Sequence, residues 1–216
     1  MLTRIWELLF PPKCILCGRL LNKRELDLCG RCRLDGPECA AVRRKIPFVE
    51  SFVAVWYYED PVRRSLLRYK FYGKRHYAKG YGRLLAMKLQ RQGEDGFDLI
   101  TWVPVSPKRR LRRGYDQVEL LAQAVCEELD LEPVSCLRKV RHNPPQSGIT
   151  GQAQRRANVL GVYDAVDPAR FAGKRVLLLD DIITTGATLS ECARVLLTAG
   201  AAQVHCAAVA AVRNQK

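Results

Sequence analysis

The chain has 216 residues, 48% of them hydrophobic and 27% charged, which is the composition of a globular protein with one ordinary domain and a small addition. A chain of this length can bury a core without disulfides, and its 15 glycines show no three-residue period, so fully disordered and collagen-like proteins are excluded. The 36 Lys and Arg residues outnumber the 22 Asp and Glu residues, and the net charge of +14 favours polyanionic partners such as nucleic acid or phosphorylated small molecules.

The predicted elements begin after residue 50 and alternate between strands and helices. Apolar runs predict strands over 52–58, 98–105, 133–137, 176–179 and 204–209. The helical spacing of apolar residues predicts helices over 62–71, 84–89, 120–125 and 187–199. Two basic segments are expected to be loops, the second with a short helix: 108–114 and 138–158. Alternation with crossovers of this length predicts an α/β fold, a parallel sheet flanked by helices.

Four of the nine cysteines form two CxxC pairs near the start of the chain: Cys14, Cys17, Cys29 and Cys32. Each CxxC turn lets two sulfurs reach one ion, and four thiolates form the tetrahedron that Zn2+ prefers. Because the protein fills all four positions, the predicted zinc is structural; redox dithiols or unrelated free cysteines are the alternatives. The other cysteines are expected to be uninvolved or buried as small hydrophobic residues: Cys39, Cys126, Cys136, Cys192 and Cys206.

The first 40 residues hold too few leucines and isoleucines for a core of their own. We therefore predict a zinc-binding module, similar to a double zinc ribbon, over 1–45 and the α/β domain over 46–216. The apolar stretch 1–10 is short and lacks a small-residue cleavage site, and no run approaches the roughly 18 apolar residues of a membrane span. An odd number of cysteines without a secretory signal favours the cytoplasm, where thiols stay reduced.

The most informative stretch is 176–189, where an apolar strand ends in Asp180 and Asp181 and a turn of small residues opens a helix. At the carboxyl edge of a parallel strand, such a turn directs backbone N–H groups and the positive end of the helix dipole at one point, which suits a phosphate monoester. These N–H groups and hydroxyls come from Thr184, Thr185, Gly186, Ala187 and Thr188. The carboxylates suit polyol hydroxyls and Mg2+, so the stretch predicts a sugar-phosphate site; an Asp pair that caps a helix is the alternative.

This stretch resembles the phosphoribosyl-pyrophosphate (PRPP) binding motif of type I phosphoribosyltransferases. With the four cysteines in front of it, the chain is similar to the ComF/ComFC family, phosphoribosyltransferase-like proteins linked to competence and DNA uptake. Further matches extend along nearly the whole chain, at 66–73, 103–105, 113–117 and 146–158. The resemblance implies a type I phosphoribosyltransferase fold preceded by a four-cysteine zinc module.

The resemblance also implies a mechanism. Asp180 and Asp181 would be the catalytic residues and would hold the ribose 2′- and 3′-hydroxyls, while the segment 184–188 would bind the 5′-phosphate of PRPP. Mg2+ would bridge pyrophosphate and ribose, and the loop that begins at Ser106, with Lys108, would contact the pyrophosphate. The implied role is phosphoribosyl transfer in competence and in nucleotide or DNA metabolism, with competence or DNA-processing proteins as partners. No segment identifies the acceptor.

One residue departs from the family pattern. Asp116 stands where ComF members usually carry Asn. If this carboxylate faces the pyrophosphate, it repels that group unless Arg112 or Arg113 pairs with it.

A second functional class follows from a basic and aromatic segment. Six Lys and Arg residues between 63 and 75 are interleaved with aromatic residues, Tyr69, Phe71, Tyr72 and Tyr77. This interleaving suits single-stranded nucleic acid, since bases stack on the rings and the cations neutralise phosphates. An amphipathic helix with core aromatics and solvated arginines is the alternative. The second hypothesis is therefore a non-catalytic single-stranded-DNA-binding or adaptor protein on a phosphoribosyltransferase scaffold.

Overall fold

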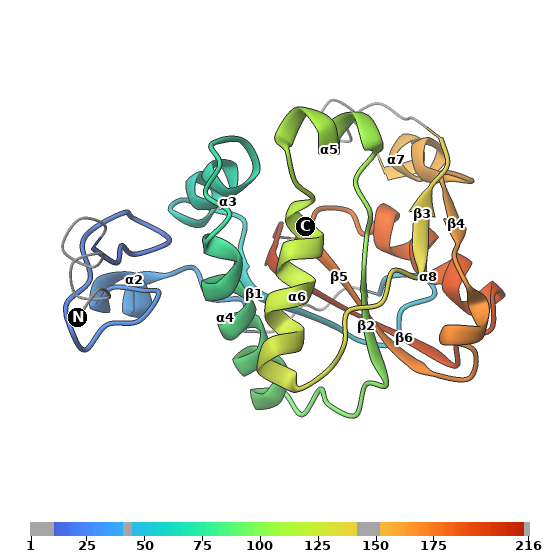
Figure 1. The fold of residues 1–216 in the computed structure, drawn as a ribbon, viewed down its shortest axis with the longest axis horizontal. Coiled ribbons are helices and arrows are strands. Elements are labelled where there is room, and N and C mark those ends of the chain that lie inside the picture. Colours follow the sequence, from blue (N-terminus) through green and yellow to red (C-terminus); the bar gives the residue numbers. More distant parts are fainter. Residues whose placement is uncertain (1–10, 41–44, 142–151, 214–216) are drawn as a thin grey trace.

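The computed structural model describes residues 11–40, 45–141 and 152–213, and its centre is a parallel sheet (Figure 1). The strand order is β1-β6-β5-β2, and every neighbouring pair is parallel. The bounds of the strands are Phe52–Tyr57 for β1, Leu99–Trp102 for β2, Arg175–Ile183 for β5 and Gln203–Ala211 for β6. The predicted α/β class and the four strands of this sheet are confirmed.

Both faces of the sheet are covered by helices, as the continuous apolar runs predict. In β5, Leu177 and Leu179 face the core beneath α4 (Tyr77–Arg91) and α6 (Gln117–Leu129). Val176 and Leu178 face the opposite core beneath α8 (Ala187–Thr198). The helices α4 and α6 pack closely at Gly82, which has no side chain: a Cβ atom at this position would lie only 2.5 Å from the Cβ of Ala124.

A two-stranded antiparallel ribbon lies beside the main sheet. It pairs β3 (Leu137–Lys139) with β4 (Tyr163–Ala165), and a 3-10 turn, Pro168–Arg170, follows. The prediction of a strand over 133–137 is therefore displaced, because Pro133 makes only a single bridge to Ile100. The helix α7 (Gln152–Val159) is the short helix that was expected within 138–158, whereas the strand β4 occupies sequence that was left unassigned. Residues 142–151 lie outside the described residues.

The basic segment predicted as a loop over 108–114 is a helix, α5 (Pro107–Arg113). Ser106 caps it by accepting a hydrogen bond from the Arg109 amide, and Pro107 stands in the first turn, where it lacks only an amide that would be unpaired. Gly114 ends the helix at φ +76°. The loop prediction was wrong because it did not use these start and stop signals.

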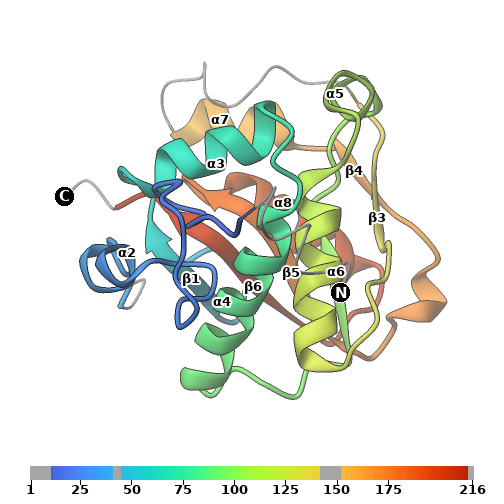
Figure 2. The same ribbon diagram turned by 60° about the vertical axis from the view of Figure 1, so that its left-hand side comes forward.

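The cysteine-containing segment packs against the domain at one edge of the sheet (Figure 2). Its short helix, α2 (Gly30–Asp35), begins within the second CxxC pair, with Cys29 as its N-cap and Cys32 in its first turn. Residues 37–39 then run antiparallel to β1, where the amides of Cys39 and Tyr57 bond to the carbonyls of Val55 and Pro37. The apolar residues between the cysteines join the core beneath α3 (Val62–Phe71) and α4, which explains how so leucine-poor a segment is held.

The cysteines outside the CxxC pairs are buried, as predicted: Cys39, Cys126, Cys136, Cys192 and Cys206. Within the described ranges, every helix is too short or too polar to cross a membrane.

Candidate functional site

A cavity of about 560 Å3 opens at the carboxyl end of the sheet. Its wall comes from the ends of β2 and β5 and from the helices α3, α5, α6 and α8, with one side closed by the β3–β4 ribbon. The charged side chains of this wall are Lys70, Arg109, Arg112, Arg113, Lys139, Asp180 and Asp181. Five cations therefore face two carboxylates, which favours an anionic ligand.

The turn from β5 into α8 supplies the cradle that the sequence predicts. Thr184 and Thr188 line the main cavity, and a small hollow beside it is formed by the backbone of Gly186 and Ala187. Gly186 has φ +82°, a conformation that favours glycine, and a Cβ atom there would lie 3.0 Å from the Ile46 side chain, which would have to move. The Thr185 hydroxyl accepts a hydrogen bond from the Ala187 amide. The start of α8 thus faces the cavity with backbone N–H groups.

Asp181 is buried and both of its carboxylate oxygens have partners. The Lys70 ammonium lies 2.8 Å from Oδ1, and the Gln117 side-chain amide donates to Oδ2 at 2.7 Å. The side chains of Lys70 and Asp181 are only 16% and 6% exposed, so the ion pair is partly shielded from water. Arg113 extends this series of hydrogen bonds by donating to the Gln117 side-chain oxygen at 2.6 Å.

Asp180 has a different environment from its neighbour. It is half-buried on the cavity wall, and its Oδ1 accepts a hydrogen bond from the Asp181 amide. Burial and the charge of Asp181 raise the pKa of Asp180 to about 8. Of the two carboxylates, Asp180 is therefore the one that a hydroxyl or a metal ion can reach, and such a ligand would favour its ionised form.

The basic wall opposite this turn comes from α5 and β3. Arg109, Arg112 and Arg113 project from α5 into the cavity, whereas Lys108 is exposed outside the lining and Ser106 is buried as the helix cap. Ser106 and Lys108 were the residues that the family resemblance implied for pyrophosphate contact, in a segment expected to be a loop. The helical period instead brings 109, 112 and 113 to one face.

Lys139 closes the same wall from β3. Burial lowers the pKa of its ammonium to about 8, and the charge of Arg109 adds to this effect. The ammonium lies 5.4 Å from the centre of the Tyr163 ring, on the neighbouring strand. A bound phosphate would raise the pKa of this lysine again and favour its charged form. Only its place in a basic loop could have indicated it from sequence.

Asp116 does not line the cavity. It is buried and caps α6, where its carboxylate accepts hydrogen bonds from the amides of Val118 and Glu119 and, at 3.0 Å, from that of Val105. The expectation that a carboxylate here could repel pyrophosphate is therefore replaced by a structural role, in which Asp116 ties the segment after β2 to the start of α6.

The aromatic residues of the basic segment divide into two groups. Tyr69 and Tyr77 are buried in the core, as the amphipathic-helix alternative predicts. Phe71 and Tyr72 are 51% and 72% exposed at the end of α3, and the Arg113 guanidinium stands 4.9 Å from the Phe71 ring centre. Phe71 also lines the cavity, so this aromatic edge is continuous with the basic site.

The four CxxC cysteines come together as one cluster. The sulfurs of Cys14, Cys17, Cys29 and Cys32 all lie within 4.8 Å of one another, and three of the four residues are buried. Burial alone would raise the pKa of the Cys29 thiol, but hydrogen bonds from the Cys32 amide and the neighbouring thiols lower it to about 7. Four converging thiols, one of them easily deprotonated, fit a tetrahedral metal ion.

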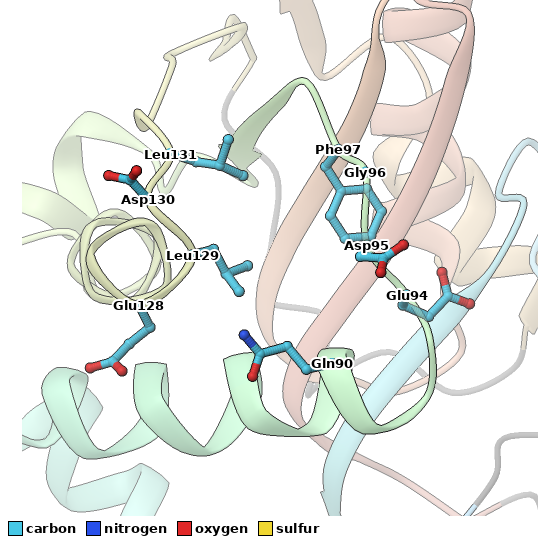
Figure 3. Close-up of a pocket in the computed structure, with 9 residues that line it drawn as sticks. All are labelled: Gln90, Glu94, Asp95, Gly96, Phe97, Glu128, Leu129, Asp130 and Leu131. Carbon is cyan, nitrogen blue, oxygen red and sulfur yellow. The ribbon is translucent and has the colours of Figure 1, made fainter.

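A second cavity, of about 430 Å3, lies at the opposite end of β2 (Figure 3). Its residues come from the end of α4, the segment before β2 and the end of α6. It carries four carboxylates, Glu94, Asp95, Glu128 and Asp130, around Phe97, Leu129 and Leu131. Four carboxylates disfavour a phosphate here, whereas the five cations at the carboxyl end of the sheet favour an anionic ligand there.

The comparisons with known proteins agree with this geometry. A family model described as a phosphoribosyl transferase domain matches residues 116–216. The chain is 28% identical over 193 residues to Competence protein F of Haemophilus influenzae, covering 84% of this chain and 83% of that protein. It is 29% identical over 201 residues to the DNA utilization protein YhgH of Salmonella typhimurium, covering 89% and 87%.

Competence protein ComFC of Streptococcus pneumoniae is 32% identical over 155 residues, which cover 71% of this chain and 65% of that protein. Over most of its length the chain is similar to proteins of the ComF family. Its fold is that of a phosphoribosyltransferase with a four-cysteine cluster in front, as the resemblance implies. Among solved structures, glutamine PRPP amidotransferase from B. subtilis is similar at a TM-score of 0.45 and 24% identity, over 65% of this chain and 30% of that one.

Asp180→Asn is expected to stabilise the protein at neutral and alkaline pH. A carboxyl group whose pKa is raised on folding holds its proton more tightly in the folded state, so the wild type loses stability as pH rises from about 4 to about 8. The variant lacks this titration, and its advantage should grow over that window to roughly 0.5–3 kcal/mol. Urea unfolding followed by tryptophan fluorescence from pH 4.5 to 9 measures it.

The matched control is Asp164→Asn, which changes an exposed carboxylate on β4 that pairs with Arg138 away from the cavity. It should show no comparable gain with pH. A constant difference between Asp180→Asn and wild type across the range contradicts the assignment.

Proposed function

We propose that the cavity at the carboxyl end of the sheet binds PRPP, or a related phosphorylated sugar, together with Mg2+. One observation carries the proposal: Asp180 and the start of α8 face the same cavity as five cationic side chains. A phosphate cradle, a reachable carboxylate and a basic wall correspond to the 5′-phosphate, the ribose and the pyrophosphate of one ligand.

Each part of PRPP then has a partner. The 5′-phosphate would accept hydrogen bonds from the turn 184–188, and Asp180 would accept them from the ribose hydroxyls. Arg109, Arg112 and Lys139 would neutralise the pyrophosphate. Mg2+ would be held through Asp180, directly or through water, and would neutralise charge on the leaving group.

The chemistry that this arrangement supports is phosphoribosyl transfer. A nucleophile would attack C1′ of the ribose while the bond from C1′ to the pyrophosphate oxygen breaks, and pyrophosphate would leave with the bonding electrons. The transition state resembles an oxocarbenium ion, so the protein acts by positioning the ligand and stabilising charge. The names of two relatives, Competence protein F and DNA utilization protein YhgH, support a role for this activity in competence and DNA utilization, and we propose that it takes place in the cytoplasm.

Calorimetric titration with PRPP tests the site. Saturable binding is expected with Mg2+ and weaker binding without it. Asp180→Asn should reduce the affinity by tenfold or more, because a neutral amide cannot hold the metal, whereas Asp164→Asn should bind as the wild type does. Equal affinity of Asp180→Asn and wild type, or no binding by the wild type with Mg2+, would refute the proposal.

We further propose that the four-cysteine cluster holds one structural Zn2+. Four protein thiolates within reach of one ion leave no position for a catalytic water. The first 45 residues would then form a zinc module docked on the phosphoribosyltransferase-like domain.

Cys14→Ser is expected to lose the zinc and to loosen the segment around it, since metal binding and folding are coupled. Metal analysis of protein purified without chelator should find about one zinc per wild-type chain. Cys39→Ser is the matched control, because Cys39 lies close in sequence but outside the cluster, and it should keep its zinc. Wild-type protein without zinc would contradict the assignment.

A second candidate function is binding of single-stranded DNA. It is favoured by the exposed rings of Phe71 and Tyr72 beside the basic helix α5. Bases could stack on these rings while the arginines contact phosphates. This surface borders the cavity, so DNA and PRPP would compete or cooperate there.

Tyr72→Ala is expected to weaken binding of a fluorescent single-stranded oligonucleotide by roughly 1–3 kcal/mol, the worth of one stacked base. The logarithm of the affinity should also fall linearly with the logarithm of salt concentration, because counterions are released. Met87→Ala, an exposed apolar change on α4, is the control. A salt-independent affinity, or equal effects of the two variants, argues against this function.

A further inference from the structure

The helix α3 contacts the backbone of the first CxxC turn through Ser65 and Arg68, and it lines the phosphoribosyl cavity with Lys70. The turn between Cys14 and Cys17 exposes the carbonyls of Ile15 and Leu16 to this helix. The Arg68 guanidinium donates to both carbonyls, and the Ser65 hydroxyl donates to that of Ile15. These hydrogen bonds attach α3 to the backbone of the CxxC turn, and the shape of that turn depends on where its two sulfurs are held.

Of the two residues after Arg68, Lys70 lines the cavity and Tyr69 is buried behind it. The Lys70 ammonium pairs with Asp181 at 2.8 Å, and the Tyr69 hydroxyl donates to the backbone carbonyl of Gln117, the residue whose side chain holds the other oxygen of Asp181. The Tyr115 hydroxyl donates back to the Tyr69 carbonyl. Three consecutive residues of one helix therefore join the cysteine turn to the carboxylates of the site.

A second attachment of the same segment provides a comparison. Arg83 of α4 binds Asp27 through two hydrogen bonds, with Nε 2.8 Å from Oδ2. Asp27 lies between the two CxxC pairs, yet no residue of α4 is among those that line the cavity. The Arg83 contact therefore docks the segment without reaching the site.

We infer that Arg68 is a positioning residue that couples the four-cysteine cluster to the phosphoribosyl site. This inference rests on the proposed function of both sites. A metal ion that gathers the four sulfurs fixes the Ile15 and Leu16 carbonyls, and these hold α3 in the register in which Lys70 meets Asp181. When the cluster opens, Arg68 loses its acceptors and the Lys70–Asp181 pair loosens. Coupling of this kind is reciprocal, so PRPP tightens metal binding by the factor by which the metal tightens PRPP binding.

The test compares Arg68→Ala, Arg68→Lys and Arg83→Ala in the full chain loaded with zinc. Arg68→Ala should keep one zinc per chain and lose PRPP affinity by roughly 5–150-fold, the usual range of coupling between sites. Arg68→Lys, which can still donate to one carbonyl, should recover part of that loss. Arg83→Ala should bind PRPP within about twofold of wild type, although it also weakens docking of the segment. The zinc affinity of the wild type, measured with a competing chelator, should rise when PRPP is added.

Hydrogen exchange separates failure of this inference from failure of the proposed function. Amides of 69–72 and 180–188 should exchange faster in Arg68→Ala than in Arg83→Ala, and faster in wild type after zinc removal, whether or not PRPP binds. If wild type does not bind PRPP, the proposed function fails and this exchange decides the coupling. Unchanged exchange at 180–188 in Arg68→Ala, or equal losses of PRPP affinity in Arg68→Ala and Arg83→Ala, would overturn the inference.

Discussion

The buried ion pair between Lys70 and Asp181 is the interaction on which the site depends. Two adjacent carboxylates end β5, and successive residues of a strand point to opposite faces, so Asp181 meets α3 and α6 while Asp180 faces Tyr163 and Cys192. Removing one partner of a buried pair typically costs about 3–5 kcal/mol, because the other charge is left uncompensated. The pair thus holds α3 in place. The two carboxylates have different roles, because Asp181 organises the site while Asp180 is available to a ligand.

The charge of the molecule is arranged along the strands of its sheet. The carboxyl end carries the five cations of the larger cavity, together with the start of α8. The amino end carries the four carboxylates of the smaller cavity, where α4 and α6 end. Parallel strands with helical crossovers place helix starts at the carboxyl end of the sheet and helix ends at the amino end. The positive and negative ends of the helix dipoles therefore add to the charges of the side chains at each end. A phosphorylated ligand is attracted to one end and repelled from the other.

The features that sequence predicted best are those with local causes. The four strands of the main sheet, the turn 184–188 and the two CxxC pairs each depend on neighbouring residues, and all are present where expected among the described residues. The basic helix α5 was missed although its cap at Ser106 and its stop at Gly114 are also local. The strand β4 has only three residues, and its pairing with β3 is a long-range contact that no local pattern announces.

The sequence by itself therefore determined the resemblance to the ComF family, the fold class, the turn 184–188 and the cysteine cluster, because in each the chemistry resides in a short run of residues. Only the tertiary structure decided that Asp116 caps α6 and that Lys70 forms an ion pair with Asp181. It also decided that the basic wall is formed by Arg109, Arg112 and Arg113. These roles depend on which face of a helix meets a strand end far along the chain. That choice is made by the packing of α3, α5 and α6 over the sheet, since spacing in the sequence does not encode distance in space.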